Sequence, residues 1–375
     1  MPKIRVLVVD DSAMMRKVLS EIVNSDPQCT AVGVAAHGRI ALAKIPQVNP
    51  DLITLDVEMP EMDGMTTLLE LRKTYPKLPV IMVSNFTQAG AAVTVKALSN
   101  GATDYVSKPT CDSAAEASNI LREQLIPKIK LYCKHLLSRE ETPSLAAPAP
   151  RAPKAASGLP AAKKCSRVDV VCIGVSTGGP NALNEVFSNV LQPVPVPIVI
   201  VQHMPPVFTR ALADRLNTVK SSVQFHEGEE GMEIEAGHAY IAPGGKHMEV
   251  RREGVRVVLR LHEGPPENSC RPAVDVMFRS IPAVYGGNIL AVILTGMGQD
   301  GLNGCEVIAE VGGRIIAQDE ASSVVWGMPS FIVKGGFADH VLPLDEVAAR
   351  ILQITRLNRD RGSISSAPPS STPIR

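Results

Sequence analysis

Short apolar runs alternate with longer helix-like segments along most of the chain. Five such runs in the first third, and four clear ones after residue 167, predict two groups of β-strands. Strands that alternate with helices are typical of a mostly parallel sheet covered by helices on both faces, so we expect two doubly wound α/β domains. The predicted strands are residues 4–10, 30–35, 51–56, 79–84 and 104–109, then 168–175, 196–202, 238–243 and 289–295.

Residues 249–263 show a different pattern, because apolar and charged residues alternate there on both sides of Gly254. A helix would repeat its apolar positions every three to four residues. The alternation therefore predicts a β-hairpin at the edge of a sheet.

A change of composition separates the two groups of strands. Residues 139–167 are rich in Ala, Pro and Ser and offer little to bury, which predicts an extended, flexible linker. Residues 359–375 have the same character and predict a disordered tail. The 375 residues are enough for two hydrophobic cores, and we expect the domains at 1–138 and 168–358.

Charge and cysteine content restrict the class of protein. The 38 basic and 38 acidic residues give a formal net charge of zero, so charge gives no argument for nucleic acid or an acidic membrane surface as a partner. The seven cysteines never form a C-x-x-C pair, which favours reduced thiols. No signal peptide is visible, and no apolar run approaches the roughly 18–20 residues that span a bilayer. We expect a cytoplasmic protein.

Polar side chains stand at the ends of four strands predicted in the first domain. Asp10 and Asp11 end the first of them, Asp56 the third, Ser84 the fourth and Lys108 the fifth. Ligands of an open α/β sheet bind beyond the carboxyl ends of its strands, so we expect these groups around one crevice. A single aspartate there could equally cap a helix, but three clustered carboxylates repel one another and favour a bound cation such as Mg²⁺.

The same positions carry a family resemblance. The stretches VVDDSAMMRKVL, LDVEMPEMDGM, MVSNFT and SKP resemble the receiver domain of two-component response regulators, over the whole first domain. The resemblance implies a flavodoxin-like fold in which Asp56 accepts a phosphoryl group. The Mg²⁺ ligands that it implies are Asp11, Asp56 and the backbone carbonyl of Glu58, with Asp10 acting indirectly, and the phosphate contacts are Ser84 and Lys108.

A serine directly follows the first strand predicted in the second domain. Residues 174–178 read G-V-S-T-G and fit the nucleophile elbow G-x-S-x-G, whose small flanking residues relieve a strained strand-to-helix turn. The pattern alone is weak, since the turn at Ser176 could instead hold an anion at a helix start. No lysine follows Gly179 as it would in a P-loop.

A nucleophilic serine needs a base. Of the eight histidines, only His203 stands directly after a buried-looking strand. His226, His238 and His262 lie in polar, loop-like surroundings, and we expect them to be solvated. His247 stands in a loop before a strand and is a weaker candidate for a site role.

Asp300 follows a third apolar strand, so all three groups are expected at the same edge of one sheet. This is the arrangement that a serine–histidine–acid triad requires. The chain order Ser176, His203, Asp300 differs from that of α/β-hydrolases, which argues against that family but not against the chemistry. The backbone N–H of Met297 is expected to face the serine and to supply half of an oxyanion hole, worth about 3 kcal/mol per donor.

A second resemblance covers nearly the whole chain. The stretches IGVSTGGP, VQHMPPVFTRALADRLN, YIAPGGKHMEV, CRPAVDVMFRS and VILTGMGQDGLNG resemble the CheB family of chemotaxis protein-glutamate methylesterases, which joins a receiver to this catalytic domain. The resemblance implies hydrolysis of glutamate methyl esters and deamidation of glutamines on methyl-accepting chemotaxis receptors, without a cofactor for hydrolysis. It also implies a chemotaxis histidine kinase as phosphodonor. The implied roles are Ser176 as nucleophile, His203 as base, Asp300 as orienting acid, and Met297 and Thr177 as oxyanion donors, with the Thr177 hydroxyl also bonding His203.

Two alternatives stay open. The second domain could bind a phosphorylated ligand at the Ser176 turn without turnover, which would leave His203 and Asp300 unexplained. It could also be a serine hydrolase acting on a non-chemotaxis membrane sensor, because specificity lies in the rim of the cleft. In the hydrolase, we expect phosphorylation of Asp56 to relieve a steric block of the Ser176 edge by the receiver.

Overall fold

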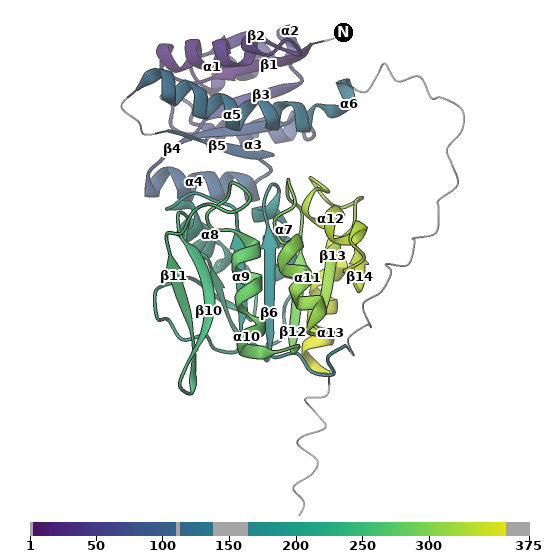
Figure 1. Cartoon of the computed structure of the whole chain (residues 1–375). Coiled ribbons are helices and arrows are strands. Elements are labelled where there is room, and N and C mark those ends of the chain that lie inside the picture. Colours follow the sequence, from purple (N-terminus) through teal and green to yellow (C-terminus); the bar gives the residue numbers. More distant parts are fainter. Residues whose placement is uncertain (1–2, 110–112, 138–163, 358–375) are drawn as a thin grey trace, which may run out of the picture. The chain divides into compact units, whose positions relative to one another are not determined.

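The computed structural model describes residues 3–109, 113–137 and 164–357. These residues form two compact units, each of them an α/β domain (Figure 1). The predicted tail at 359–375 and most of the predicted linker at 139–167 lie outside the described residues. No helix among the described residues is long and apolar enough to cross a membrane.

The first unit is built on a parallel sheet of five strands in the order β2-β1-β3-β4-β5, which confirms the five strands predicted there. The strands are β1 (Ile4–Val9), β2 (Cys29–Ala35), β3 (Leu52–Asp56), β4 (Val80–Asn85) and β5 (Asp104–Lys108). The helices are α1 (Ala13–Ser25), α2 (Gly38–Val48), α3 (Gly64–Thr74), α4 (Gln88–Ser99), α5 (Ala114–Tyr132) and α6 (Lys134–Leu137).

The central strand β1 shows why this unit folds as a covered sheet. Successive side chains of a strand point to opposite faces, and both faces of β1 are apolar. Val6 and Val8 pack with buried residues of α1 and α5, whereas Leu7 and Val9 pack with buried residues of α2, α3 and α4. Helices on both faces therefore cover a strand that carries almost no polar residue until Asp10.

The second unit is built on a parallel sheet of seven strands in the order β14-β13-β12-β6-β7-β9-β8, and the four clear strands predicted there are confirmed. The strands are β6 (Val170–Val175), β7 (Ile198–Gln202), β8 (Gln224–Glu227), β9 (His238–Ile241), β12 (Ile289–Ile293), β13 (Arg314–Gln318) and β14 (His340–Leu342). The helices are α7 (Gly179–Ser188), α8 (Phe208–Leu216), α9 (Val274–Ser280), α10 (Pro282–Tyr285), α11 (Leu302–Glu310), α12 (Met328–Lys334) and α13 (Leu344–Arg356).

The predicted hairpin is present as β10 (His247–Glu253) and β11 (Arg256–His262), which pair antiparallel. Its predicted position at a sheet edge is wrong, because the two strands form a separate two-stranded sheet. The physical reason is its apolar face, where Val250 and Leu259 are buried in one cluster with Phe278 of α9. The hairpin covers this helix instead of extending the main sheet.

The start of the second unit also differs from the predicted boundary at Val168. Cys165 donates its backbone N–H to the carbonyl of Gly312 and accepts hydrogen bonds from Arg314. Lys164 forms an ion pair with Asp339 at 3.0 Å. Residues 164–167, which composition alone assigns to the linker, therefore belong to the second unit.

In each sheet, the strand that comes first in the chain lies between two later strands. β1 lies between β2 and β3, and β6 lies between β7 and β12. The connections leave such a strand in opposite directions, which opens a crevice beyond its carboxyl end. Asp10 and Ser176 follow β1 and β6 directly, so both candidate sites begin at these crevices.

Candidate functional site

The carboxyl ends of β1 and β3 bring three carboxylates together. Oxygen atoms of Asp10, Asp11 and Asp56 lie within 4.8 Å of one another. The Nζ of Lys108, at the end of β5, lies 3.0 Å from an oxygen of Asp10 and 3.0 Å from an oxygen of Asp56. One ammonium does not neutralise three carboxylates, so these oxygen donors fit a divalent cation such as Mg²⁺.

The pKa of Asp56 reflects this crowding. Burial raises it to about 6, and the neighbouring charge of Asp10 acts in the same direction, whereas Lys108 and the backbone N–H of Val57 oppose them. That N–H donates to Oδ1 of Asp56 at 2.8 Å. A cation that neutralised the cluster would favour the ionised form of Asp56.

The remaining candidate residues of the first unit lie at the same edge. Glu58 and Asp11 line an open pocket of about 460 Å³, and the Glu58 side chain accepts a hydrogen bond from Asn85 at 3.2 Å. Ser84 is buried near the end of β4, and its hydroxyl donates to the carbonyl of Asn85. Asn85 in turn pairs with Lys108 across β4 and β5. The carboxyl ends of the strands therefore bring together the residues that the sequence predicts around one crevice.

In the second unit, Ser176 stands at the turn from β6 to α7. Its carbonyl accepts hydrogen bonds from the backbone N–H of Gly179 at 2.8 Å and from the side-chain amide of Gln202 at 3.0 Å. Gly178 has a φ of 80°, a value that favours glycine, and a Cβ there would lie 2.7 Å from Val324. The turn is therefore tight, and the buried Gln202 holds its Ser176 carbonyl. The sequence pattern did not single out Gln202.

His203 follows β7, the neighbour of β6. Its backbone N–H donates to the carbonyl of Val175, which puts it beside the Ser176 turn. Its Nε2 lies 2.7 Å from Oδ2 of Asp300, and its Nδ1 lies 3.5 Å from the Sγ of Cys270. No hydrogen bond links the Ser176 or Thr177 hydroxyl to His203 among the described residues; catalytic hydrogen bonds are often long before substrate binds.

The protonation of His203 follows from these neighbours. Burial works to lower the pKa of His203, but the hydrogen bond to Asp300 and the contact with Cys270 outweigh burial and raise it to about 9. The pKa of Asp300 is lowered, because the bond to His203 outweighs the opposing effect of burial. The pair is thus stabilised as imidazolium and carboxylate.

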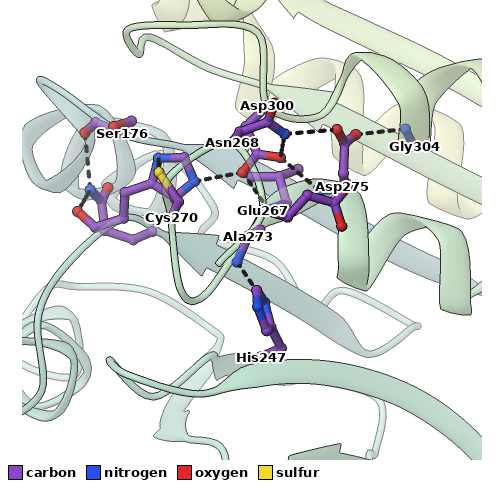
Figure 2. A network of polar contacts seen from close by, with 12 residues as sticks. Ser176, His247, Glu267, Asn268, Cys270, Ala273, Asp275, Asp300 and Gly304 are labelled. Carbon is purple, nitrogen blue, oxygen red and sulfur yellow. Dashed lines mark hydrogen bonds and ion pairs between the residues drawn. The ribbon is translucent and has the colours of Figure 1, made fainter. Parts of the chain in front are cut away.

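Asp300 accepts four hydrogen bonds, although its side chain is buried. Its Oδ2 accepts from His203 and from the backbone N–H of Val274 at 2.7 Å. Its Oδ1 accepts from the backbone N–H of Asp275 and the side-chain amide of Asn268, each at 3.0 Å. The N-terminus of α9 and the amide therefore fix the orientation of this carboxylate (Figure 2).

The backbone after β12 passes close to Ser176. A Cβ added to Gly296 would lie 2.8 Å from the Cβ of Ser176. The backbone at Met297, the next residue in the chain, therefore begins close to Ser176. The Met297 N–H donates to no acceptor in the described part of the chain, and its side chain is 46% exposed. The carbonyl of Thr177 accepts from the buried Thr295 hydroxyl at 3.0 Å.

Four further histidines were considered as candidates in the sequence. His247 is buried, and its ring bonds the backbone of Pro265 and Ala273. The loop-like surroundings expected for His226 are wrong, because it lies on β8, next to His238 on the predicted strand β9, with ring nitrogens 2.9 Å apart. His262 lies in β11, the second strand of the predicted hairpin.

Comparison with protein families places both units. A model described as CheB methylesterase matches residues 171–351, and one described as response regulator receiver domain matches residues 6–117. A relative from Trichodesmium erythraeum, named protein-glutamate methylesterase/protein-glutamine glutaminase, is 49% identical over 356 residues, which cover 94% of this chain and 99% of the relative.

Further similarities are to a second relative and to a solved structure. A Nocardioides relative with the same name is 45% identical over 370 residues, covering 98% of this chain and 99% of the relative. The crystal structure of the Thermotoga maritima CheB methylesterase catalytic domain is 40% identical and covers 50% of this chain and 98% of that chain, with a TM-score of 0.48.

Proposed function

The chain belongs to the CheB methylesterase family, and from this premise we propose how its residues perform the reaction. The protein is a phosphorylation-regulated hydrolase that demethylates glutamate methyl esters and deamidates glutamines on methyl-accepting chemotaxis receptors. The observation that carries the assignment of residues is the His203–Asp300 pair beside the Ser176 turn. A substrate and a phosphodonor of this kind support a cytoplasmic location for the protein.

Ser176 is the proposed nucleophile and His203 its base. Since Nε2 of His203 bonds Asp300, Nδ1 is the nitrogen that takes the proton of the serine hydroxyl. The serine oxygen attacks the ester carbonyl carbon, the bond to the methoxy group breaks, and methanol leaves with that proton. Water then hydrolyses the acyl-serine with the help of the same base. On a glutamine side chain, ammonia is the leaving group.

Two further groups support this step. Asp300 holds the ring of His203 and stabilises the imidazolium that forms after proton transfer. The backbone N–H groups of Met297 and of the Thr177 region are the proposed donors to the developing oxyanion. Support for Met297 comes from its free N–H and from the close approach of Gly296 to Ser176.

In the receiver unit, Asp56 is the proposed acceptor of a phosphoryl group from a chemotaxis histidine kinase. When bound, Mg²⁺ supplies positive charge that neutralises the phosphoryl oxygens. The residues that would hold the metal are Asp11, Asp56 and the Glu58 carbonyl, with Asp10 acting indirectly, and those that would contact the phosphate are Ser84 and Lys108.

The test is methanol release from receptor membranes that carry labelled methyl esters. The full chain should release labelled methanol, and addition of a small acyl phosphate as phosphodonor should increase the rate. Asp56→Asn should keep the unstimulated rate and lose the increase. Tight binding of a phosphorylated ligand without any methanol release would favour the alternative of a binding domain.

A further inference from the structure

A tight turn at 267–270 lies next to the His203–Asp300 pair. Glu267 and Cys270 exchange both of their backbone hydrogen bonds, at 2.9 and 3.1 Å. Between them, Asn268 and Ser269 have φ values of 51° and 62°. Two non-glycine residues in the left-handed region store strain, which persists only where surrounding contacts fix it, and asparagine tolerates this region better than most residues.

The turn is anchored from outside the site. Arg279 of α9 donates to both carboxylate oxygens of Glu267, at 2.6 Å each. This paired contact fixes the start of the turn to the helix whose N-terminus holds Asp300. Turn and helix together set where the Asn268 side chain lies.

The side chain of Asn268 points between two carboxylates (Figure 2). Its Nδ2 lies 3.0 Å from Oδ1 of Asp300 and 3.1 Å from Oδ2 of Asp275. Both acceptors are anionic oxygens, so the amide must present its NH₂ group to them. Asn268 therefore bridges the acid of the proposed triad to a second buried carboxylate.

The charges explain why a donor is needed at this place. Burial raises the pKa of Asp275, and the nearby charge of Asp300 raises it further, whereas the bond from Asn268 lowers it. Without the amide, two buried carboxylates would face each other, and Oδ1 of Asp300 would keep only the backbone N–H of Asp275 as a donor among the described residues. Asp300 would then be less firmly held toward His203.

We propose that Asn268 is a positioning residue of the hydrolytic site, which acts on the reaction only through Asp300 and His203. The kinetic consequence of this proposal rests on the proposed function, but the effect of Asn268 on His203 is independent of any substrate. Because Asn268 is exposed and lies on a turn, its substitution leaves the core intact.

The experiment compares Asn268→Ala and Asn268→Asp with Asn303→Ala in the full chain. Asn303 is a matched control, because its amide also donates to Oδ2 of Asp275, at 3.3 Å, but has no bond to Asp300. The readouts are kcat and KM for methanol release from labelled receptor membranes, and the pH titration of the His203 ring by NMR. His203→Gln identifies the His203 signal.

Asn268→Ala should lower kcat about tenfold with little change in KM when both are measured above the pH at which His203 titrates, since the ring is neutral there in both chains and one charge-assisted hydrogen bond is lost. The bond to Asp300 raises the pKa of His203, so its loosening should move the titration of His203 to lower pH. Asn268→Asp adds a negative charge near Asp300 and should move that titration to higher pH. Asn303→Ala should change neither kcat nor the titration.

The proposal is overturned if Asn268→Ala leaves both the kcat and the His203 titration at the wild-type values. It is also overturned if kcat falls while the titration does not move, because a merely structural role would give that result. If the wild-type chain releases no methanol, the proposed function fails instead. The titration then decides alone whether Asn268 positions the pair.

Discussion

In the receiver unit, carboxylates outnumber the cation beside them, whereas in the catalytic unit each charge of the candidate pair has a partner. Lys108 faces both Asp10 and Asp56, with Asp11 close by. Asp300, in contrast, accepts four hydrogen bonds, one of them from the imidazole of His203. Both sites lie beyond the central strands of parallel sheets, so the difference comes from the side chains and not from the fold.

Because of this difference, the first site is suited to act as a switch and the second to act in catalysis. A cluster with excess negative charge changes strongly when a cation and a phosphoryl group bind, which is what a switch requires. A carboxylate that already accepts four hydrogen bonds is oriented before substrate arrives, so little reorganisation is needed at the moment of reaction. The predictions below test whether the two sites behave in these opposite ways.

The largest effect is expected from Ser176→Ala. Loss of the nucleophile should lower the rate of methanol release by at least about 10⁴-fold, as in serine hydrolases with a triad. Phosphorylation of Asp56, measured with a labelled acyl phosphate, should be unchanged because it takes place on another sheet. Substantial turnover in this variant would remove Ser176 from the mechanism.

Asp300→Asn should have a smaller effect than Ser176→Ala, because His203 can still accept a proton while it is less well oriented. An amide has a single acceptor atom, so some of the four donors around this position would be left unpaired. We therefore also expect a loss of stability of about 1–3 kcal/mol in urea unfolding of the catalytic unit. A variant as stable as the wild type would show that these hydrogen bonds are not needed.

Mg²⁺ should stabilise the receiver unit and leave the catalytic unit unchanged. At a concentration of about 100 times its dissociation constant, binding should add about 2.7 kcal/mol to the free energy of unfolding of the receiver unit. Thermal melting of the full chain with Mg²⁺ or with a chelator measures this. Asp11→Asn is the control, and an equal response of this variant would place the metal elsewhere.

The smallest effect is expected from Cys270→Ala. The contact with Cys270 contributes to the raised pKa of His203, and hydrolysis requires the neutral ring. Wild-type kcat/KM should therefore rise with pH with a midpoint at about 9, and this midpoint should move to lower pH in the variant. Cys165→Ala is the matched control, since Cys165 is the other partly buried thiol among the described cysteines.

The pH profile of the control should match that of the wild type. If Cys270→Ala gave that same profile, the thiol would have no influence on the base. A wild-type midpoint near the ordinary value of about 6.5 would contradict the stabilised imidazolium.

The strands and the residues at their ends could be predicted from the sequence, because the signal for both is local. An apolar run that ends in Asp56, Ser176 or His203 is visible in the text, and parallel strands bring such ends to one edge. Asn268 and Cys270 could not be found in this way. They lie on a turn without periodicity, between the hairpin and α9, and only tertiary packing brings that turn to Asp300 and His203.

The errors have a similar origin. The pattern of residues 249–263 predicts a hairpin at a sheet edge, and this position is wrong because alternation shows that one face is buried but not what covers it. The strand β8, which carries His226, is too short and too polar for a clear pattern, and the contact of His226 with His238 depends on the pairing of β8 with β9. In both cases, the missing information was the partner and not the local structure.

The most direct test of the central claim is to map the residue that a fluorophosphonate modifies in the full chain. Activation of Ser176 by His203 predicts one covalent adduct, located by mass spectrometry on the peptide that contains Ser176. The adduct should be lost in His203→Gln. An adduct at another residue, or an unmodified Ser176 in a chain that still releases methanol, would contradict the account.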